Sequence, residues 1–279
     1  MTKLWGTDKN RLQAAFLPAI AGILLSSGAA IAAAQLPPAA PNPPPPGATT
    51  QPAVPPKAPE STRPDPMRTD WPNLKRFHDD DVALPPPAPG EQRVVFMGDS
   101  ITQGWIHNGV PPEPPVSGRL YVNRGISGQT TPQMLLRFRQ DVIDLKPSAV
   151  VIFAGTNDVA GNTGDMTPEQ TEGNLSSMAE LAHAHNIRVI LCSILPAFDF
   201  PWKPGREPAL KIVAINNWIK SYTAANDYVY VDFYSAMVDD RGGLPEKLSH
   251  DGVHPTPAGY AVMNPLIEAG IAKALAATN

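Results

Sequence analysis

Residues 93–102 have the sequence Arg-Val-Val-Phe-Met-Gly-Asp-Ser-Ile-Thr, a short apolar run that ends at a glycine and is followed by polar residues. Similar apolar runs recur along the chain, and most of them are continuous rather than alternating with polar residues. Continuous apolar runs are typical of parallel strands that are covered on both faces of a sheet. We therefore predict strands over Arg93–Met97, Leu120–Val122, Ala149–Phe153, Ile187–Ile194 and Tyr228–Phe233.

Amphipathic stretches lie between the predicted strands and indicate helices. Two of these stretches have one apolar face at helical spacing, formed by Leu135, Phe138, Val142 and Leu145, and by Ile212, Ile215, Ile219 and Tyr222. Strands that alternate with helices through short loops predict an α/β fold with a doubly wound parallel sheet. In such folds the ligand binds at the carboxyl ends of the strands.

Threonine-proline pairs mark three predicted helix starts, because threonine caps free amides and proline fits the first helical position without losing a hydrogen bond. The pairs are Thr131-Pro132, Thr167-Pro168 and Thr256-Pro257, and Gln170 completes a capping box after Thr167. A further helix is expected at the start of the domain, with Asp70 as N-cap before Trp71, Leu74 and Phe77. The folded domain is therefore expected to span residues 69–279.

The composition limits the class of protein. The chain has 279 residues and 34 prolines, where average usage gives roughly 14, but eighteen of them lie between Gln35 and Gly90. The remaining length suits one folded domain. A single cysteine, Cys192, excludes an intramolecular disulfide and lies in an apolar run, which predicts a buried, unreactive thiol. A net charge of −4 without a basic cluster argues against a nucleic-acid partner.

Residues 1–34 have the pattern of a secretory signal peptide. Lys3, Lys9 and Arg11 precede an uncharged stretch from Leu12 to Ala34 that ends in small residues. The same stretch is long enough for an uncleaved membrane anchor, which is the alternative. Both interpretations predict an exported protein, periplasmic or secreted, that stays attached to the membrane if the segment is not cleaved.

Residues 35–68 are rich in proline and alanine, with an unbroken proline run from Pro43 to Pro46. Such a segment has too few apolar side chains to offset the entropy of ordering, and proline favours an extended chain. It predicts a disordered linker, through which the N-terminal part of the chain would associate with the cell envelope. A proline-rich ligand for a partner protein is the alternative.

Residues suited to acyl transfer follow the predicted strands. The stretches are Gly98-Asp99-Ser100, Asn123-Arg124-Gly125-Ile126-Ser127-Gly128, Gly155-Thr156-Asn157-Asp158 and, before the last helix, Asp251-Gly252-Val253-His254-Pro255. Each is a weak signal alone, since serine often caps a helix and glycine often forms a turn. Together they supply a nucleophile, a base, a group that orients the base, and hydrogen-bond donors for an oxyanion.

These four stretches resemble the four sequence blocks of the SGNH hydrolases, also called GDSL-type esterases and lipases. The resemblance extends from about Asp70 to the carboxyl terminus and implies a flavodoxin-like three-layer αβα sandwich with a five-stranded parallel sheet. It implies a serine carboxylic-ester hydrolase that needs no cofactor and no metal. Ser100 would be the nucleophile, His254 the general base and Asp251 its partner, with an oxyanion hole formed by the amides of Ser100 and Gly125 and the side chain of Asn157.

Four aromatic residues near the strand ends are candidates for substrate binding: Trp105, Phe198, Phe200 and Trp202. The sequence contains no insertion typical of a long apolar lid, which favours a short acyl group, above all acetyl, on a small-molecule or glycan ester. A lipase or lysophospholipase for longer acyl chains is one alternative. A non-catalytic envelope-binding module that retains the fold is the other.

Other polar residues near these stretches are assigned structural roles. Asp99 and Asp158 are expected to brace their loops through backbone hydrogen bonds. His183 and His185 are two residues apart on a predicted helix and point in different directions, which argues against a metal site. Ser100 lacks the Gly-x-Ser-x-Gly motif of the α/β-hydrolases, so that fold is disfavoured although its Ser, Asp, His order is the same.

Overall fold

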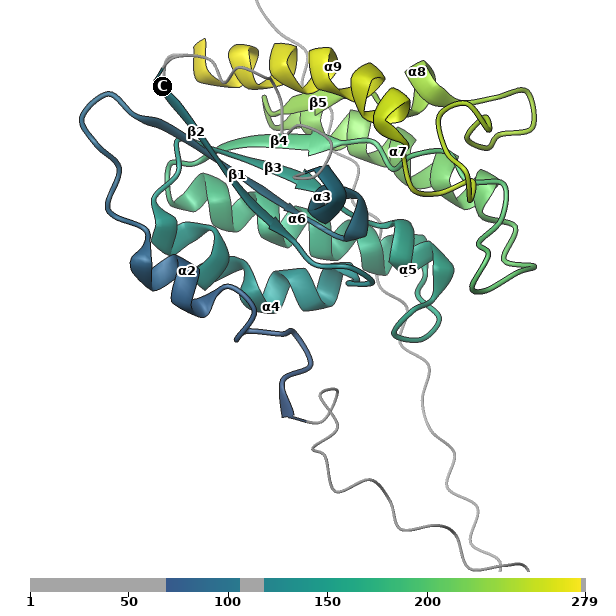
Figure 1. Cartoon of the computed structure of the whole chain (residues 1–279), viewed down its shortest axis with the longest axis horizontal. Helices are drawn as coiled ribbons and strands as arrows, with labels where there is room; N and C mark the ends of the chain where they lie inside the picture. The colour runs from purple at the N-terminus through teal and green to yellow at the C-terminus, as the bar shows by residue number, and fades with distance from the viewer. Residues whose placement is uncertain (1–68, 106–117, 277–279) are drawn as a thin grey trace, which may run out of the picture. The chain divides into compact units, whose positions relative to one another are not determined.

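The computed structural model describes residues 69–105 and 118–276. The predicted signal segment (1–34) and linker (35–68) lie outside the described residues. Five parallel strands form one sheet in the order β2-β1-β3-β4-β5, which confirms the predicted flavodoxin-like α/β class (Figure 1). The strands are β1 (Gln92–Gly98), β2 (Arg119–Gly125), β3 (Ala149–Phe153), β4 (Arg188–Cys192) and β5 (Val229–Val231).

All five predicted strands are present, and their ends differ for local reasons. β2 extends to Gly125 through the polar residues Asn123 and Arg124, which interrupted the apolar run in the sequence. β4 stops at Cys192 because the chain after it bonds to a later helix instead of a strand. The amide of Ile194 donates to the side chain of Asn216, in the helix Pro208–Ala225, at 2.7 Å. As predicted, Cys192 is buried, and burial raises the pKa of its thiol.

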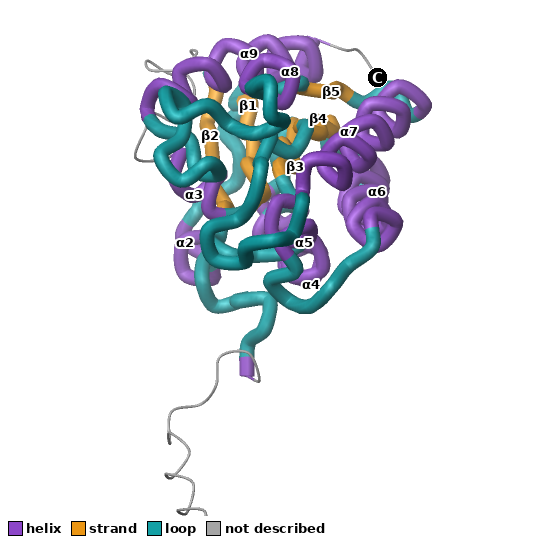
Figure 2. Tube along the Cα trace, turned by 90° about the vertical axis from the view of Figure 1, so that its right-hand side faces the viewer, coloured by secondary structure: helices purple, strands orange, loops and turns teal. Residues whose placement is uncertain are grey.

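Helices cover both faces of the sheet. Figures 1 and 2 show α9 and α8 on one face and α4, α6 and α7 on the other. The helices are α2 (His78–Ala83), α3 (Ser100–Trp105), α4 (Thr131–Asp141), α5 (Thr156–Ala160), α6 (Pro168–Ala184), α7 (Pro208–Ala225), α8 (Tyr234–Met237) and α9 (Pro257–Ala276). No helix of the described residues is long and apolar enough to cross a membrane.

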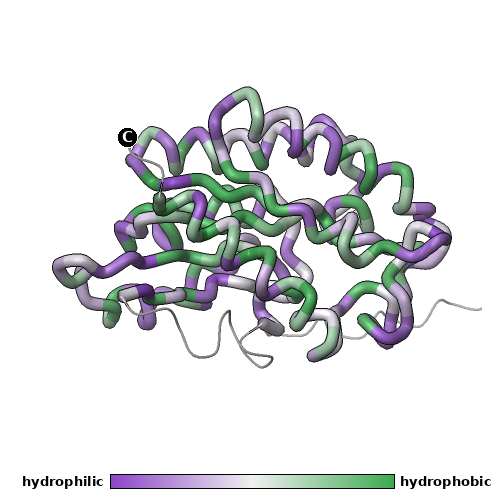
Figure 3. The backbone as a smooth tube through the Cα atoms, turned by 90° about the horizontal axis from the view of Figure 1, so that it is seen from above, coloured by the Kyte–Doolittle hydropathy of each residue, from purple (hydrophilic) through white to green (hydrophobic). Residues whose placement is uncertain are grey.

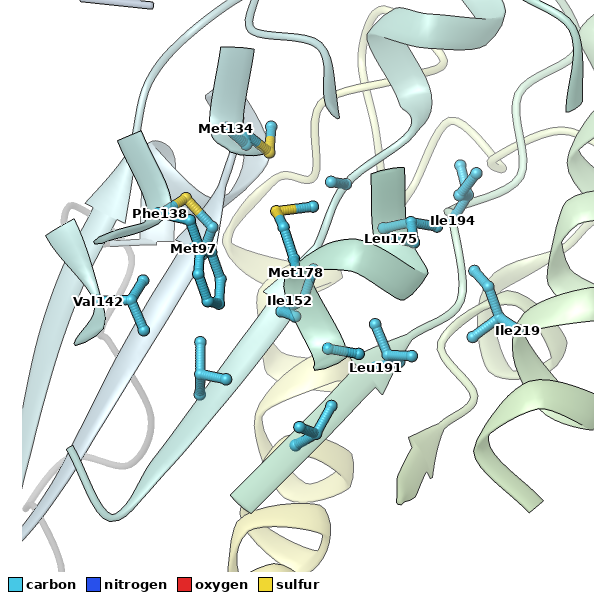
Figure 4. Packing of buried hydrophobic residues seen from close by; sticks show 14 of the residues in the cluster. Met97, Met134, Phe138, Val142, Ile152, Leu175, Met178, Leu191, Ile194 and Ile219 are labelled. Atoms are coloured by element: carbon cyan, nitrogen blue, oxygen red, sulfur yellow. The ribbon is translucent and has the colours of Figure 1, made fainter. Parts of the chain in front are cut away.

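Alternate residues of the central strands enter two separate cores. On one face Met97, Ile152 and Leu191 pack against α4, α6 and α7, as Figure 4 shows. On the other face Phe96 and Phe153 pack against α3 and α9. Figure 3 shows hydrophobic residues along the strands and a mixture of hydrophobic and hydrophilic residues along the surrounding helices. Burial on both faces explains why the strand sequences are continuously apolar.

The predicted helix starts are correct in two of three cases. Thr167 and Gln170 form the capping box of α6. The hydroxyl of Thr256 accepts the amide of Gly259 at the start of α9. At α4, however, the N-cap is Thr130 rather than Thr131, because Gln133 pairs with Thr130. Two threonines in succession offer two caps, and Asp158 binds the second one, so the choice depends on tertiary contacts.

The helix predicted after Asp70 is wrong. Residues 71–77 form turns, and the first described helix after them is α2. Asp70 does accept hydrogen bonds from two backbone amides, those of Leu74 and Lys75, as a capping residue would. The chain turns because the carbonyls of Trp71 and Pro72 bond to side chains of the α4 region, Gln133 and Gln129, at 2.8 and 2.7 Å.

A buried arginine joins α4 to the central strand. Arg137 has no exposed surface, and its guanidinium donates to Gln129 Oε1 at 2.6 Å, Asp141 Oδ2 at 2.8 Å and the carbonyl of Gly98 at 3.1 Å. Gly98 is the last residue of β1, directly before Asp99 and Ser100. The guanidinium therefore holds the carboxyl end of β1 against α4. Its charge is paired with Asp141, and each of its three nitrogens donates a hydrogen bond.

We expect Arg137→Met to lower the free energy of unfolding by about 3–5 kcal/mol, because the variant leaves Asp141 charged and buried without its partner. Arg139→Met on the same helix is the matched control, since Arg139 is exposed and should change stability by less than about 0.5 kcal/mol. Urea unfolding followed by circular dichroism measures both. A loss below about 1 kcal/mol for Arg137→Met would contradict this account.

Candidate active site

The carboxyl end of β1 presents Ser100 as the first residue of α3. Its hydroxyl Oγ lies 2.9 Å from Nε2 of His254, a residue 154 positions later in the chain. As the first residue of a helix, Ser100 has a backbone amide without a carbonyl partner in that helix. Its position thus combines a hydroxyl beside a base with an amide that is free to bind an anion.

His254 is oriented by Asp251 from the same loop before α9. Nδ1 of the imidazole lies 2.6 Å from Asp251 Oδ2, and the other carboxylate oxygen accepts the amides of Val253 and His254 at 2.9 and 2.8 Å. Burial alone would raise the pKa of Asp251, but the hydrogen bonds from His254 and Val253 outweigh it and lower the pKa to about 2. An ionised Asp251 only accepts, so Nδ1 carries the proton and Nε2 accepts the Ser100 hydroxyl.

Helix α9 fastens this loop to the helix of Ser100. The hydroxyl of Tyr260 donates to the carbonyl of Ile101 at 2.7 Å, and Trp105 Nε1 donates to Asn264 Oδ1 at 2.7 Å. Trp105 has no exposed surface and contacts four aromatic rings of the core. This corrects the expectation that Trp105 binds substrate: it joins α3 to α9.

Gly125 does not have the free amide expected of an oxyanion donor. Its N–H donates to Oδ1 of Asn123 at 2.9 Å. A Cβ at position 125 would lie 2.3 Å from the backbone nitrogen of Gln103, so this glycine allows β2 to pack closely on α3. The structure therefore does not support the predicted role of Gly125 and explains the glycine by packing instead.

Gly128, three residues later, has the free amide instead. Among the described residues no hydrogen bond involves its N–H, whereas its carbonyl accepts Asn162 Nδ2 at 3.3 Å. Its φ of +78° is in the left-handed region, which glycine adopts without strain. No described atom lies within 4 Å of the place a Cβ would occupy, so the residue borders open space.

Asn157 follows β3 and is buried beside the loop of Ser100. Its side-chain nitrogen Nδ2 donates to the carbonyl of Gln129 at 3.0 Å and, over a longer 3.3 Å, to Asp99 Oδ2. Its oxygen Oδ1 accepts Asn162 Nδ2 at 2.7 Å. These partners fix the orientation of the carboxamide, with Nδ2 toward Asp99. Asn162 thus helps to orient Asn157, and no sequence pattern singled Asn162 out.

Two buried carboxylates brace the loops of the site. Asp99 accepts the amide of Ile101 at 2.9 Å, and its burial raises its pKa to about 7. Asp158 accepts the amide and hydroxyl of Thr131 and the hydroxyl of Thr171, and its burial raises its pKa. Both groups accept backbone amides as well as neighbouring side chains and so brace the loops of the site, as expected from the sequence.

The three aromatic residues after β4 differ in exposure. Phe200 has no exposed surface and packs in the core, so the expectation that it binds substrate is corrected. Phe198 is 59% exposed and Trp202 40% exposed. The ring centroids of Trp202 and His254 are 6.0 Å apart. Sequence position could not separate these residues, because exposure is decided by how the loop folds.

Two hollows flank the site. One, of about 270 Å³, is lined in part by Phe198, Arg241 and Asp251. The other, of about 470 Å³, contains Gly128 and Asn162 among mainly polar neighbours. His183 on α6 and His185 just after it are exposed and line neither hollow. In residues 69–105 and 118–276, no group of three or more histidine, cysteine or acidic side chains is placed to hold a metal ion.

The comparison with known proteins agrees with this arrangement. Residues 96–262, more than half of the chain, match the GDSL-like lipase/acylhydrolase family. The chain belongs to this family. The match extends from the strand before Ser100 into the helix after His254, and so contains Ser100, Gly128, Asn157, Asp251 and His254.

Several known proteins are similar to parts of this chain. A GDSL-like lipase from Bacteroides thetaiotaomicron is 47% identical, with a TM-score of 0.70 over 74% of this chain and 100% of that chain. The esterase TesA of Pseudomonas aeruginosa is 33% identical over 175 residues, 59% of this chain and 80% of TesA. The lipoprotein YqeF of Bacillus subtilis is 34% identical over 124 residues, 39% of this chain but only 51% of YqeF.

Asp99 should make stability depend on pH in a definite direction. Its pKa is about 7 in the folded protein and near 3.8 ordinarily, so between these values the folded protein holds a proton that the unfolded chain has released. The contribution of Asp99 to the stability of the fold is complete below its ordinary pKa of 3.8. This contribution is lost as the pH rises through its pKa of about 7 in the folded protein. An asparagine at this position cannot titrate.

We therefore expect Asp99→Asn to gain stability relative to the unmodified protein between about pH 4.5 and 7.5, by on the order of 2–4 kcal/mol. Urea unfolding of both proteins at several pH values measures this difference. Other titrating groups, such as Asp81 with its pKa raised by burial to about 6, are present in both proteins and cancel. A difference that stays constant with pH would be inconsistent with the raised pKa of Asp99.

Proposed function

We propose that this GDSL-family protein is a serine esterase that hydrolyses short-chain acyl esters. One observation supports it above all: Asp251, His254 and Ser100 form a continuous chain of hydrogen bonds with distances of 2.6 and 2.9 Å. This order of acid, imidazole and hydroxyl is the arrangement that activates a serine for attack on a carbonyl. A binding module without catalysis would need none of the three in this relation.

In the proposed mechanism Ser100 Oγ attacks the ester carbonyl and passes its proton to Nε2 of His254. Asp251 stabilises the imidazolium that forms. The tetrahedral intermediate collapses when His254 returns the proton to the leaving alcohol oxygen, and an acyl-Ser100 ester remains. Water, deprotonated by His254, then hydrolyses this ester and releases the carboxylic acid. No step requires a cofactor.

The oxyanion of the tetrahedral intermediate needs donors that the resting protein leaves free or only weakly bonded. We assign this role to the amides of Ser100 and Gly128 and to Nδ2 of Asn157. Gly128 replaces Gly125 because the amide of Gly125 is already bonded to Asn123. The hydrogen that Asn157 directs at Asp99 has its acceptor at 3.3 Å, a weak contact that an oxyanion can replace.

The direction of proton transfer suggests where the acyl group lies. The leaving oxygen receives its proton from His254 Nε2, so the alcohol lies on the histidine side. We place the acyl group on the other side of Ser100, in the hollow that Gly128 borders. The hollow at Gly128 is lined mainly by polar residues, including Asn162, Thr163 and Gln129. A long alkyl chain would desolvate these groups without bonding to them, which favours acetyl and other short acyl groups over the chains of a lipase.

We further propose that the enzyme acts outside the cytoplasm. Residues 1–34 have the pattern of a secretory signal or anchor, and the relative YqeF is a lipoprotein. The proline-rich residues 35–68 would then connect the catalytic domain to the cell envelope. The substrate class consistent with this location is a small-molecule or glycan ester.

We expect the purified protein to hydrolyse p-nitrophenyl acetate faster than the butyrate ester and far faster than the palmitate ester. Ser100→Ala should lose at least about 10³ in kcat, because the nucleophile is absent. Fluorophosphonate labelling of the unmodified protein but not of Ser100→Ala, read by mass spectrometry, tests the nucleophile independently of the choice of ester. Activity retained in Ser100→Ala would overturn the mechanism, and a preference for palmitate would overturn the short-chain assignment.

Asn157→Ala should lower kcat by about 10²–10³ with a smaller change in KM, since an oxyanion donor acts mainly in the transition state. Asn217→Ala is the control, because Asn217 is an exposed residue of α7 outside the site. Steady-state kinetics on one acetyl ester measures both variants. If Asn157→Ala loses less than about threefold in kcat, Asn157 is not an oxyanion donor.

A further inference from the structure

The loop after β4 is held rigidly in a way that presents Trp202 to the site. The carboxylate of Asp199 accepts the amides of Phe200, Gly205 and Arg206, which closes the loop on itself. Arg206 Nε donates to the carbonyl of Ala160 at 3.1 Å and so ties the loop to the end of α5. Because the loop is bonded both within itself and to α5, its tip, which carries Trp202, is held in one position.

Trp202 itself is fixed on three sides yet remains exposed. Its Nε1 donates to Asn162 Oδ1 at 2.9 Å, and its ring centroid lies 5.3 Å from that of the buried Phe200. On a third side its ring lies 6.0 Å from the imidazole of His254, inclined by 41°. Despite these contacts 40% of Trp202 is exposed. A tryptophan fixed in this way and left open to solvent has apolar surface available to a ligand.

The hollow of about 270 Å³ is lined in part by Phe200 and Pro201, the two residues before Trp202, and the charged side chains in its lining have partners. Its lining includes Asp251 and Gly252 of the acid–base loop, Phe198, and Arg241. The guanidinium of Arg241 stacks on the Phe198 ring at 5.6 Å and pairs with Asp239 at 3.1 Å. Asp199, also in the lining, is occupied by backbone amides. These residues suit a neutral ligand that combines an apolar face with hydroxyl groups, rather than an ion.

The chemistry of ester cleavage assigns this region to the alcohol. His254 Nε2 must reach the leaving oxygen, so whatever is attached to that oxygen lies on the side of His254 where Trp202 stands. We propose that Trp202 is a platform on which the alcohol half of the substrate stacks, and that this half is the ring of a pyranose sugar. The C–H groups on one face of the sugar pack on the indole, while its hydroxyls face the charged side chains of Asp251 and Arg241 in the largely apolar lining of the hollow. The proposal rests on the proposed esterase function.

The test compares two acetyl esters whose alcohols differ in size: an acetylated methyl β-D-xylopyranoside and ethyl acetate. Trp202→Ala removes the platform, and Trp202→Phe keeps an aromatic ring but loses the N–H bond to Asn162. Leu210→Ala is the matched control, because Leu210 is 84% exposed on α7 and lies outside the lining of the hollow. For each variant kcat and KM are measured on both esters.

We expect Trp202→Ala to lower kcat/KM for the sugar ester by about tenfold more than for ethyl acetate, mainly through KM. Trp202→Phe should lie between Trp202→Ala and the unmodified protein, and Leu210→Ala should not separate the two esters. Equal losses on both esters would overturn the proposal, because the ring would then act only by holding His254 or Asn162 in position. No loss on either ester would also overturn it.

Binding without hydrolysis distinguishes failure of this proposal from failure of the esterase assignment. Calorimetric titration of Ser100→Ala with the acetylated xylopyranoside should give a Kd that rises about tenfold in the double variant Ser100→Ala/Trp202→Ala. If the unmodified protein hydrolyses neither ester, the esterase assignment fails, while the titration still decides the role of Trp202. An unchanged Kd in the double variant would overturn the platform.

Discussion

The parallel pairing of β1 between β2 and β3 is the constraint on which the site depends. Gly98 at the end of β1 lies opposite Gly125 of β2 on one side and Phe153 of β3 on the other. Because all strands run the same way, the chain leaves each of them at the same end of the sheet, where Asn157 bonds to Asp99, the residue before Ser100. A shift in the register of either pair would separate these side chains.

Buried polar side chains next to the carboxyl ends of the strands keep the loops of the site in position. Asp99, Asp158 and Arg137 are almost completely buried, and each is bonded to backbone atoms of the loops or strands that carry the site. Burying such groups is unfavourable unless they are bonded, as these are. The raised pKa values of Asp99 and Asp158 record this cost. The protein thus gives up part of its stability to hold a nucleophile and its neighbours in fixed positions.

Local patterns were sufficient for the strands, because continuous apolar runs are a property of neighbouring residues. Ser100, Asp251 and His254 were singled out by the resemblance of their sequence blocks to a known family, and the structure places them within hydrogen-bond distance of one another. Features that depend on distant partners were not predictable in this way. Which of Gly125 and Gly128 has a free amide is decided by the side chain of Asn123. Whether an aromatic ring is buried or exposed depends on how its loop packs, and Asn162 carries no local signal because its partners lie in three separate segments.

The hydrogen bond between Ser100 and His254 also links the first strand of the sheet to the last part of the folded chain. Asp251 and His254 arrive together in one short loop, but their nucleophile is 154 residues earlier in the chain. The contacts that lock the two parts together, from Tyr260 to Ile101 and from Asn264 to Trp105, belong to α9. A chain that has formed the sheet but has not docked this helix therefore lacks the contacts that hold Ser100 and His254 together. Under the proposed mechanism, hydrolysis requires the last helix to be in place.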